Sequence, residues 1–368
     1  MNTRRWWFLF LVLGLTAAAE TPRPGEGNVR SYRVLVMGDA HFDAGEFHQT
    51  PPATDGRKSE RERNFKMWKA KSPALFAAAG KRATAESVAF AVQLGDLVQG
   101  DCDNAVLQQA MIRKGFAEVK KNFPRTALLP VKGNHDIRTV KKSKNAAAAD
   151  PELLPIISRE LGAEVGNNSC YSFMRGRDLY LAVDGFISAK SIEAFVKATL
   201  DAHPDTRYVF FMTHLPLLPA SIGGPFWLVP GHDRIVKLLE KRNTLILAAH
   251  THAPSLSTRT TKQGKVTQLI VSSMGHSWGM KLKPEGCRDW KSYAAAVEKS
   301  LAAKNTKKAA DQRKRWAAWK ASGTSTFRHL FGNSGFVVLD IDDARVEARY
   351  YINHSAKPGV TLKLLTAR

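Results

Sequence analysis

The stretch that decides the fold is Pro130-Val131-Lys132-Gly133-Asn134-His135-Asp136. It closes an apolar run, residues 126–131, with a glycine and then with three polar residues that can bind metals or transfer protons. Open α/β sheets place their ligand sites at the carboxyl ends of buried strands, which is where these residues would lie. Because Gly-Asn is also ordinary turn chemistry, the stretch indicates a site only if other strands end in the same way.

Other predicted strands also end in residues that bind metals. Each such residue alone has an ordinary explanation as a cap, a turn or a packed loop histidine. The predicted strands and the residues that follow them are 32–37 with Asp39 and His41, 87–94 with Asp96, 126–131 with Asn134 and His135, 207–212 with His214, and 244–249 with His250 and His252. So many coincidences are hard to obtain by chance, and we therefore interpret the set as one site.

Strand-like runs alternate with helical segments in the first half of the chain, which predicts a layered α/β fold. The helical patterns cover 60–79, 104–122, 151–161, 191–202 and 232–242. Ser72-Pro73 either breaks the first of these or starts a second helix, because proline is favoured at the first helical position. Residues 43–58 are expected to form a loop, and Arg175-Gly176-Arg177-Asp178 is expected to turn a hairpin.

A second sheet is expected from the C-terminal half of the chain. Its predicted strands are 265–272 and 336–341, and 345–352 is expected to pair after a turn at Asp342-Asp343. Residues 281–330 are rich in Lys, Arg, Ala and Trp, which predicts a basic helical insertion covering one side of the core. The tryptophans in and near this segment either stack on nucleic acid or anchor its helices on the core, and we favour anchoring. They are Trp278, Trp290, Trp316 and Trp319.

Composition bounds the class of protein. The chain has 368 residues, of which 44% are hydrophobic, enough for one large domain or two smaller ones. Its formal net charge of +22 favours anionic partners, namely phosphorylated small molecules, nucleic acid or an anionic envelope surface. Three cysteines, Cys102, Cys170 and Cys287, allow at most one internal disulfide and form no CxxC metal motif. The chain is therefore not a disulfide scaffold.

The first residues predict export. Arg4 and Arg5 precede a short apolar run at 6–15, and Ala17-Ala18-Ala19 fits the small-residue cleavage pattern of a signal peptide. The run is shorter than the roughly 20 residues of a membrane span, so we expect no transmembrane segment after cleavage near Glu20. An uncleaved N-terminal anchor is the alternative. The expected divisions are a signal peptide at 1–19, a flexible lead-in at 20–30 and one domain at 31–368 in a periplasmic or secreted protein.

The residue types at the strand ends suit a pair of metal ions. Imidazole nitrogen together with carboxylate or amide oxygen suits divalent Mn, Fe, Zn or Ni. Two such ions about 3.5–4 Å apart need a ligand that touches both, and they lower the pKa of a bridging water. A carboxylate such as Asp96 can bridge in this way.

Taken in order, these motifs resemble those of the calcineurin-like metallophosphoesterase superfamily. They are Asp39-x-His41, Gly95-Asp96, Gly133-Asn134-His135-Asp136, His214 and His250-x-His252. The resemblance implies a four-layer sandwich of two mixed β-sheets flanked by helices, with a dinuclear metal centre at the strand ends. Two departures stand out: Ala249 replaces a frequent glycine, and Gln99 stands where purple acid phosphatases carry a tyrosine. A tyrosinate-bound centre is therefore not expected.

The resemblance also implies a role for each site residue. The implied ligands are Asp39, His41 and His252 for the first metal, Asn134, His214 and His250 for the second, and Asp96 as the bridge. His135 would be a catalytic residue that does not bind metal and faces the substrate. Asp136 would orient His135 by accepting its ring N–H.

The function expected from these features is that of an exported metal-dependent phosphoesterase. It would hydrolyse a phosphomonoester or phosphodiester by attack of a metal-bridging hydroxide, on a phosphorylated small molecule rather than nucleic acid. Peripheral contact with an anionic envelope surface would be compatible with the charge. The alternative is a non-catalytic binder of an anionic polymer, either an envelope glycan or nucleic acid, through the basic segment 281–330. Weaker candidates for substrate contact are His48, Arg57 and His276.

Overall fold

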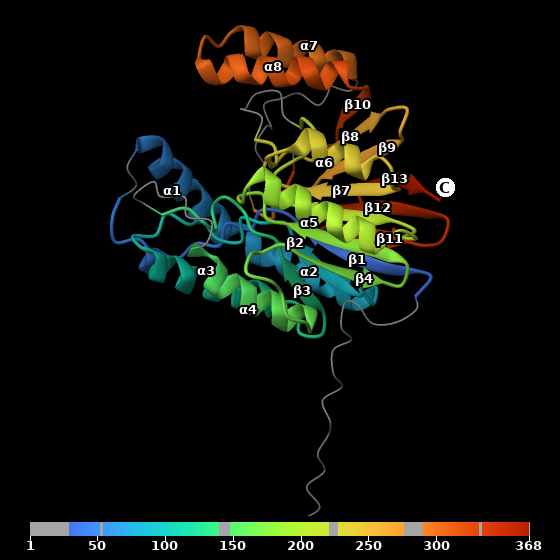
Figure 1. The fold of residues 1–368 in the computed structure, drawn as a ribbon. Helices are drawn as coiled ribbons and strands as arrows, with labels where there is room; N and C mark the ends of the chain where they lie inside the picture. Colours follow the sequence, from blue (N-terminus) through green and yellow to red (C-terminus); the bar gives the residue numbers. More distant parts are fainter. Residues whose placement is uncertain are drawn as a thin grey trace, which may run out of the picture.

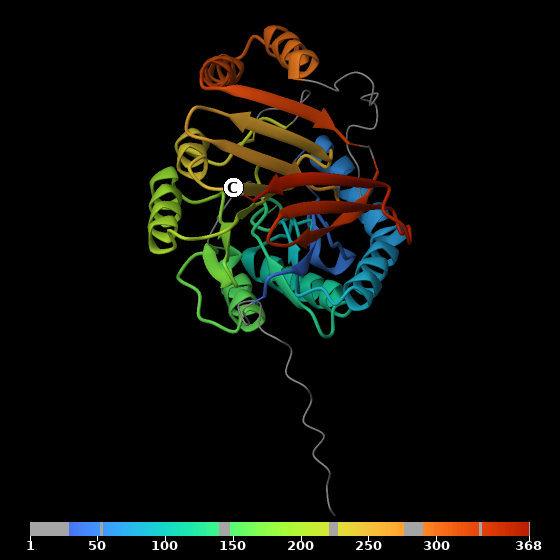
Figure 2. The same cartoon turned by 90° about the vertical axis from the view of Figure 1, so that its right-hand side faces the viewer.

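The computed structural model describes residues 29–51, 54–139, 148–220, 227–275, 290–330 and 333–367. Two mixed β-sheets lie face to face, and helices cover the outer face of each (Figures 1 and 2). The predicted signal peptide, His276, Trp278 and Cys287 lie outside the described residues. The expected four-layer α/β architecture is confirmed.

The first sheet has six strands in the order β13-β12-β11-β1-β2-β3. Its parallel part consists of β1 (Tyr32–Met37), β2 (Phe90–Gln93) and β3 (Ala127–Pro130). The remaining strands run antiparallel to their neighbours and are β11 (Gly335–Ile341), β12 (Arg345–Ile352) and β13 (Val360–Thr366). The parallel strands end on one edge of the sheet, so the loops that follow them meet there.

The second sheet has seven strands in the order β10-β8-β9-β7-β6-β5-β4. Its central parallel strands are β5 (Asp178–Val183), β6 (Val209–Thr213), β7 (Thr244–Ala248) and β9 (Lys265–Ile270). The flanking antiparallel strands are β4 (Tyr171–Arg175), β8 (Ser255–Thr260) and β10 (Thr324–His329).

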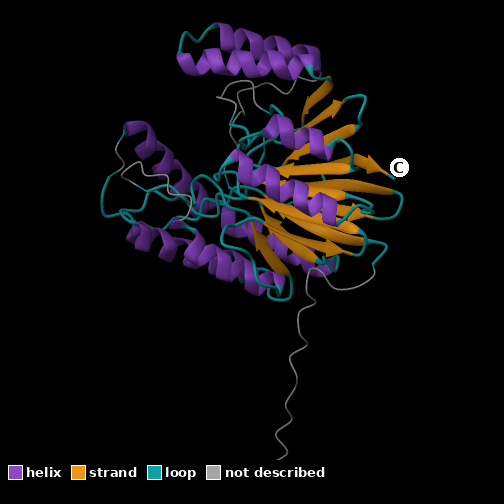
Figure 3. Ribbon diagram, in the orientation of Figure 1, coloured by secondary structure: helices purple, strands orange, loops and turns teal. Residues whose placement is uncertain are grey.

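Helices complete the layers, as the purple ribbons of Figure 3 show. The first sheet is covered by α2 (Ser72–Ala85), α3 (Ala105–Lys120) and α4 (Asp150–Leu161), while α1 (Asp55–Ala70) and the short 3₁₀ turn η1 (Gly45–Phe47) lie nearer the strand ends. The second sheet is covered by α5 (Ala189–Ala202) and α6 (His232–Leu239), with α7 (Trp290–Ala302) and α8 (Lys307–Ala321) stacked beyond them. The helix boundaries follow local signals: the Asn104 side chain caps α3, and Gly162 ends α4 with a φ of 71°.

The alternation of side chains along the second sheet creates two cores. Tyr180, Phe210 and Leu245 face the first sheet and join the core between the sheets. Leu181 and Phe211 point the other way, into a second core under the outer helices. Because the central strands are apolar on both faces, they are held in place from both sides, and their carboxyl ends form a rigid edge.

Three sequence expectations about the fold are wrong. β11 and β12 do not belong to the sheet of β9, because β11 pairs antiparallel with β1, Val34 opposite Leu339. Residues 43–58 are not entirely loop, because α1 starts at Asp55 behind its cap, Thr54. Segment 281–330 is not entirely helical, since its last residues form β10. Its status as an insertion stays a prediction.

The tryptophans of the basic segment anchor its helices, as we favoured. Trp316 and Trp319 are buried, each only 6% exposed, and Trp290 packs against Trp316.

Cys102 and Cys170 are buried and free. Over the described part of the chain, no helix combines the length and apolarity needed to cross a membrane.

Candidate metal centre

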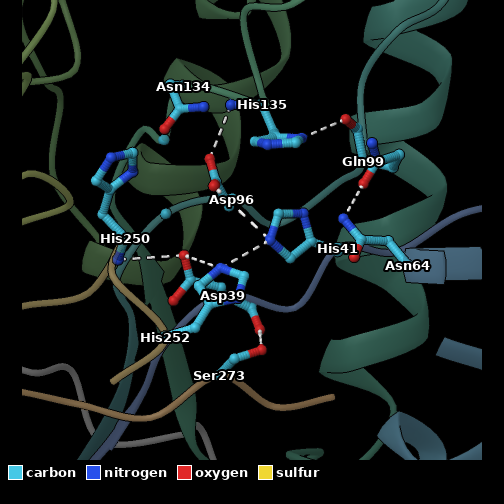
Figure 4. Close-up of polar contacts among 12 residues, drawn as sticks. Asp39, His41, Asn64, Asp96, Gln99, Asn134, His135, His250, His252 and Ser273 are labelled. Atoms are coloured by element: carbon cyan, nitrogen blue, oxygen red, sulfur yellow. Dashed lines mark hydrogen bonds and ion pairs between the residues drawn. The ribbon is translucent and has the colours of Figure 1, made fainter. Parts of the chain in front are cut away.

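The carboxyl ends of five strands from the two sheets bring the predicted ligands together. Asp39 and His41 follow β1, Asp96 follows β2, and Asn134 follows β3 in the first sheet. His214 follows β6 in the second sheet, and His250 and His252 follow β7. Figure 4 shows most of these side chains converging from opposite sides on one small volume.

The first group consists of Asp39, His41, Asp96 and His252, all buried, with ligand atoms within 4.8 Å of one another. His252 Nε2 lies 3.2 Å from both His41 Nε2 and Asp39 Oδ1. His41 Nε2 also lies 3.8 Å from Asp96 Oδ2. Asp39 Oδ2 and His41 Nδ1 are buried without a hydrogen-bond partner. Two imidazole Nε2 atoms crowded against each other and an unsatisfied buried carboxylate oxygen fit a divalent cation.

The second group consists of Asp96, His214 and His250. His214 Nε2 lies 3.3 Å from Asp96 Oδ2, 3.0 Å from His250 Nδ1 and 3.1 Å from Asn134 Oδ1. The other ring nitrogen, His214 Nδ1, lies 2.9 Å from the carbonyl oxygen of Leu94 and donates to it. This bond turns Nε2 toward the group, as outer partners of metal-binding histidines commonly do.

Asp96 belongs to both groups of possible ligands and therefore joins them into one candidate centre. Its Oδ2 atom faces His41 of the first group and His214 of the second. The residues that can form a dinuclear metal site are therefore Asp39, His41, Asp96, His214, His250 and His252, with the amide oxygen of Asn134 beside them.

The backbone is strained at these positions. His41, Asp96, His250 and His252 have positive φ angles of 48°, 51°, 67° and 53°. Among the described residues, seven other than glycine have a positive φ, and these are four of them. Such conformations cost energy and persist where the surrounding structure enforces them, which is typical of ligand sites.

Two glycines next to the ligands are required by close approach. At Gly95, whose φ is 86°, an added Cβ would lie 2.7 Å from His214 Nδ1. At Gly133 it would lie 1.9 Å from the backbone nitrogen of Asp96. The glycines of the Gly-Asp and Gly-Asn pairs are therefore required because a side chain at either position would push the neighbouring loops apart.

Burial and mutual charge set the protonation of the ligands. Burial lowers the pKa of His41 and of His250 to about 3, which keeps both imidazoles neutral and able to bind metal. Burial opposes charge on Asp96 too, but the adjacent His214 and His135 hold the pKa of its carboxyl well below the usual range. Burial likewise disfavours protonated His214, yet Asp96 outweighs it and raises the His214 pKa to about 9.

The predicted hydrogen bond between Asp136 and the His135 ring is wrong. His135 Nδ1 lies 2.7 Å from the Gln99 carbonyl oxygen and donates to it. The Asp136 carboxylate instead accepts from the backbone nitrogens of Gly133 at 2.7 Å and Val98 at 3.1 Å. It closes the turn that carries Asn134 and His135, because its short side chain reaches back to the main chain three residues earlier. Burial and Asp96 raise its pKa to about 7.

An ion-pair network lies beside His135, and of its four residues the sequence singled out only Arg57. Glu60 Oε1 of α1 lies 3.8 Å from His135 Nε2, and Glu60 Oε2 lies 2.8 Å from Arg138 Nη1. Arg138 also donates to Asp101, which pairs with Arg57. None of these four residues ends a strand, and only the fold brings α1 to the site.

The weaker candidates for substrate contact have partners within the protein. His48 Nε2 lies 2.6 Å from Asp43 Oδ1, and Arg57 donates to Asp101 and to the Thr139 carbonyl oxygen. Their contact with substrate stays a prediction.

The sequence pattern of one family, calcineurin-like phosphoesterase, matches residues 32–254, which include every ligand named above. The chain belongs to the calcineurin-like phosphoesterase family. Together with the shared Asp96, membership supports a metallophosphoesterase, a phosphoric ester hydrolase. A search of curated proteins found no match to this chain.

Solved structures of similar fold cover most of this phosphoesterase. A purple acid phosphatase, PPD1 from yellow lupin (Lupinus luteus) seeds, matches 93% of the chain at 14% identity with a TM-score of 0.53. A dimetal phosphatase from Danio rerio matches 91% of it and 99% of its own length at 12% identity, also with a TM-score of 0.53. GAP50, the anchor in the inner membrane complex of Plasmodium, matches 92% of it and 90% of its own length at 12% identity with a TM-score of 0.51. The chain spans 55% of the lupin protein. At these identities the likeness shows the fold.

Proposed function

We propose that the protein is an exported metal-dependent phosphoesterase that hydrolyses a phosphomonoester or phosphodiester of a small molecule. One observation carries the proposal: the Asp96 carboxylate is shared by two buried groups of ligands. A structure with a single ion would need only one group. The fold alone does not decide, because a protein of this fold is also described as an anchor.

Each part of the centre has a defined task. Asp39, His41 and His252 would hold one ion, Asn134, His214 and His250 the other, and Asp96 both. Two divalent ions supply Lewis acidity that activates water and neutralises the charge on phosphoryl oxygens. Mn, Fe, Zn and Ni all suit this donor set.

His135 is positioned to assist the leaving group. Its Nδ1–H is fixed on the Gln99 carbonyl oxygen, so the ring presents Nε2 to the side where Glu60 lies. The ring also stands edge-on to His41, with 4.5 Å between centroids, and is therefore beside the first group. In hydrolysis, a water oxygen bonds to phosphorus, the ester P–O bond breaks, and the departing oxygen takes a proton. Because Nδ1–H is bound to Gln99 and burial lowers the pKa of His135 well below its usual range, Nε2 of the resting ring carries no proton. Nε2 would first take the proton that the attacking water loses and would then donate it to the departing oxygen.

Charge and side-chain burial support an anionic small molecule as substrate. The net charge of +22 attracts phosphoesters. Trp316 and Trp319 are buried against the core, so these two rings are not available to stack on nucleic acid.

The test is hydrolysis of a panel of chromogenic phosphoesters with added Mn, Zn, Ni or Fe. Asp96→Asn should lower kcat/KM by more than about 100-fold, since even outer partners of metal ligands are worth 10–100-fold. Asp201→Asn, the same change at a surface carboxylate of α5, is the matched control and should leave turnover unchanged. Turnover that is equal in both variants would contradict the proposal.

Export is supported by the positive charges of Arg4 and Arg5, the short apolar run at 6–15 and the small residues at 17–19. Fractionation of the producing cells, followed by N-terminal sequencing, tests it. A mature protein that begins near Glu20 outside the cytoplasm is expected. A chain that keeps residue 1 and stays with the membrane would favour the uncleaved anchor.

Binding of an anionic polymer is the second candidate. Arg313, Lys314 and Arg315 form an exposed basic run on α8. Strong, salt-dependent polyanion binding without hydrolysis under any metal would favour it. The shared Asp96 argues against it, because a pure binder gains nothing from two aligned groups of metal ligands.

A further inference from the structure

A basic cavity lies at the end of the molecule opposite the candidate metal centre. Its volume is about 730 Å³, which is in the range of pockets that hold small molecules. A single carboxylate lines it, that of Asp343, together with five cationic side chains from separate segments of the chain. These cations are Arg30, Arg177, Arg207, Lys241 and Arg242.

The strands that carry metal ligands separate this cavity from the centre. Arg207 and Asn243 line the cavity just before β6 and β7 begin. His214 and His250 follow the other ends of the same strands, whose five residues span roughly 17 Å. Ala367, another lining residue, adjoins the C-terminus labelled in Figure 1, on the side of the molecule away from α1. The cavity is therefore a second location, distinct from the ligand cluster.

Arg207 holds two of the other cationic segments in place. Its guanidinium pairs with the buried carboxylate of Asp178 and with Asp343, so its own charge is neutralised within the protein. Its backbone nitrogen donates to the Arg177 carbonyl oxygen at 2.8 Å, and its Nη1 donates to the Arg30 carbonyl oxygen at 2.9 Å. The main chains that carry Arg30 and Arg177 are thus fixed at the cavity by one residue.

The turn before β7 supplies the remaining cations. Asn243 ties this turn to its surroundings, because its carbonyl oxygen accepts a backbone hydrogen bond from β6 and its side chain donates to a carbonyl oxygen of β13. The Arg242 guanidinium donates to two carbonyl oxygens, one in α5 and one just after it. These carbonyls hold the guanidinium in place without cancelling its charge. Lys241, the preceding residue, is exposed.

Four of the five cations have no carboxylate to neutralise them. Within the described part of the chain, no carboxylate forms an ion pair with Arg30, Arg177, Lys241 or Arg242. Like charges held around one cavity repel one another, and an anion placed between them removes that cost. The hydroxyl of Thr206, also a lining residue, is buried and has no hydrogen-bond partner among the described residues. The lining therefore suits an anion that accepts several hydrogen bonds.

We propose that this cavity is a second binding site, which takes a phosphate group, either as inorganic phosphate or on a small molecule. Arg30 and Arg177 pair with the phosphate oxygens, because the guanidinium fork matches their geometry, and Lys241 adds a point charge. Arg207 is a positioning residue. The site lies apart from the metal ligands, so the inference does not depend on hydrolysis at the centre.

The test measures phosphate binding to a protein whose metal centre is damaged. In Asp96→Asn the shared ligand is lost, so saturable binding of radiolabelled phosphate in equilibrium dialysis should come from the basic cavity. Addition of Arg30→Gln, Arg177→Gln and Lys241→Gln should weaken this binding about 100-fold, because three charge-assisted contacts are removed. All three side chains are exposed, so the fold should persist, which melting temperatures check.

A matched control separates a built site from attraction by net charge. Lys81→Gln, Lys121→Gln and Lys197→Gln remove the same charge from exposed lysines that do not line the cavity. Added to Asp96→Asn, these changes should leave phosphate binding nearly unchanged.

A second ligand distinguishes the two sources of phosphate. Phenylphosphonate carries phosphorus on carbon, so ester hydrolysis does not consume it. Binding of phosphate and phenylphosphonate, both lost with the three cavity cations, assigns the cavity to phosphate groups on larger molecules as well as to the free ion. Binding of phosphate alone assigns it to the ion.

Two results would overturn the proposal. One is an Asp96→Asn protein that binds neither ligand saturably. The other is equal binding after removal of the cavity lysine and arginines and after removal of the control lysines. Turnover by the wild type tests the proposed function separately, so either conclusion can fail while the other stands.

Discussion

Lys132 Nζ lies 2.7 Å from Asp184 Oδ2, and neither side chain is exposed to solvent. Asp150, at the start of α4, completes the ion cluster at 2.5 Å. Lys132 stands two residues before Asn134, and Asp184 directly follows β5 of the other sheet. The pair therefore fastens the loop of a proposed metal ligand to the opposite sheet.

Removal of the Lys132 charge should destabilise the protein. Lys132→Met leaves the buried carboxylate of Asp184 and the partly buried carboxylate of Asp150 without this cation, and breaking a buried pair in this way costs about 3–5 kcal/mol. Thermal unfolding followed by circular dichroism measures the loss. Lys121→Met, which removes an exposed partner of Glu118, should cost less than about 1 kcal/mol. Equal melting temperatures for the two variants would contradict this role of the cluster.

Gly133→Ala should damage the centre itself. A Cβ at this position would overlap the backbone of Asp96, so the two loops would have to separate. We expect loss of bound metal and of phosphoester hydrolysis, measured by elemental analysis and by turnover. Gly45→Ala is the matched change, because its Cβ would meet nothing within 4 Å. A Gly133→Ala protein with full metal content would show that the loops tolerate the separation.

The neighbours Asn134 and His135 should differ in what they lose. His135→Ala removes a proposed proton donor and should lower kcat by about 10²–10⁴-fold while metal content stays the same. Asn134→Ala removes an oxygen 3.1 Å from His214 Nε2 and should weaken binding of the second ion. Metal titration and kinetics on both variants separate the effects. If both lose metal equally, the proposed division of roles is wrong.

Metal should stabilise the folded protein. Ions that bind only the native state add about 2.7 kcal/mol when free metal is 100 times the dissociation constant. The melting temperature should therefore rise with added Mn or Zn and fall with a chelator. The same additions should change Asp96→Asn much less, since this variant lacks the shared carboxylate. An equal rise in both proteins would indicate binding elsewhere.

The sequence was sufficient for the parts of the site that depend on local pattern. Apolar runs with a polar residue at their ends located Asp39, Asp96 and His214, because a buried strand and its final turn are encoded by adjacent residues. The turn motif at 175–178 predicted the β4–β5 hairpin, and the start of α2 at Ser72 was one of the two outcomes considered for Ser72-Pro73.

Contacts between segments that are far apart in the sequence could not be predicted from local pattern. Which sheet β11 joins depends on a pairing with β1 three hundred residues earlier in the chain, and strand periodicity does not name a partner. β8 was missed because its sequence, Ser-Leu-Ser-Thr-Arg-Thr, is mostly polar. The partner of His135 was misassigned because a backbone carbonyl, that of Gln99, has no sequence signature.

The central claim is that Asp96 joins two metal ions in one centre, and metal stoichiometry tests it most directly. Native mass spectrometry of protein loaded with Mn or Zn should find two ions per chain in the wild type. It should find fewer than two in Asp96→Asn, with two retained in the Asp201→Asn control. A wild type that never binds more than one ion, or an Asp96→Asn protein that still binds two with unchanged affinity, would contradict the account.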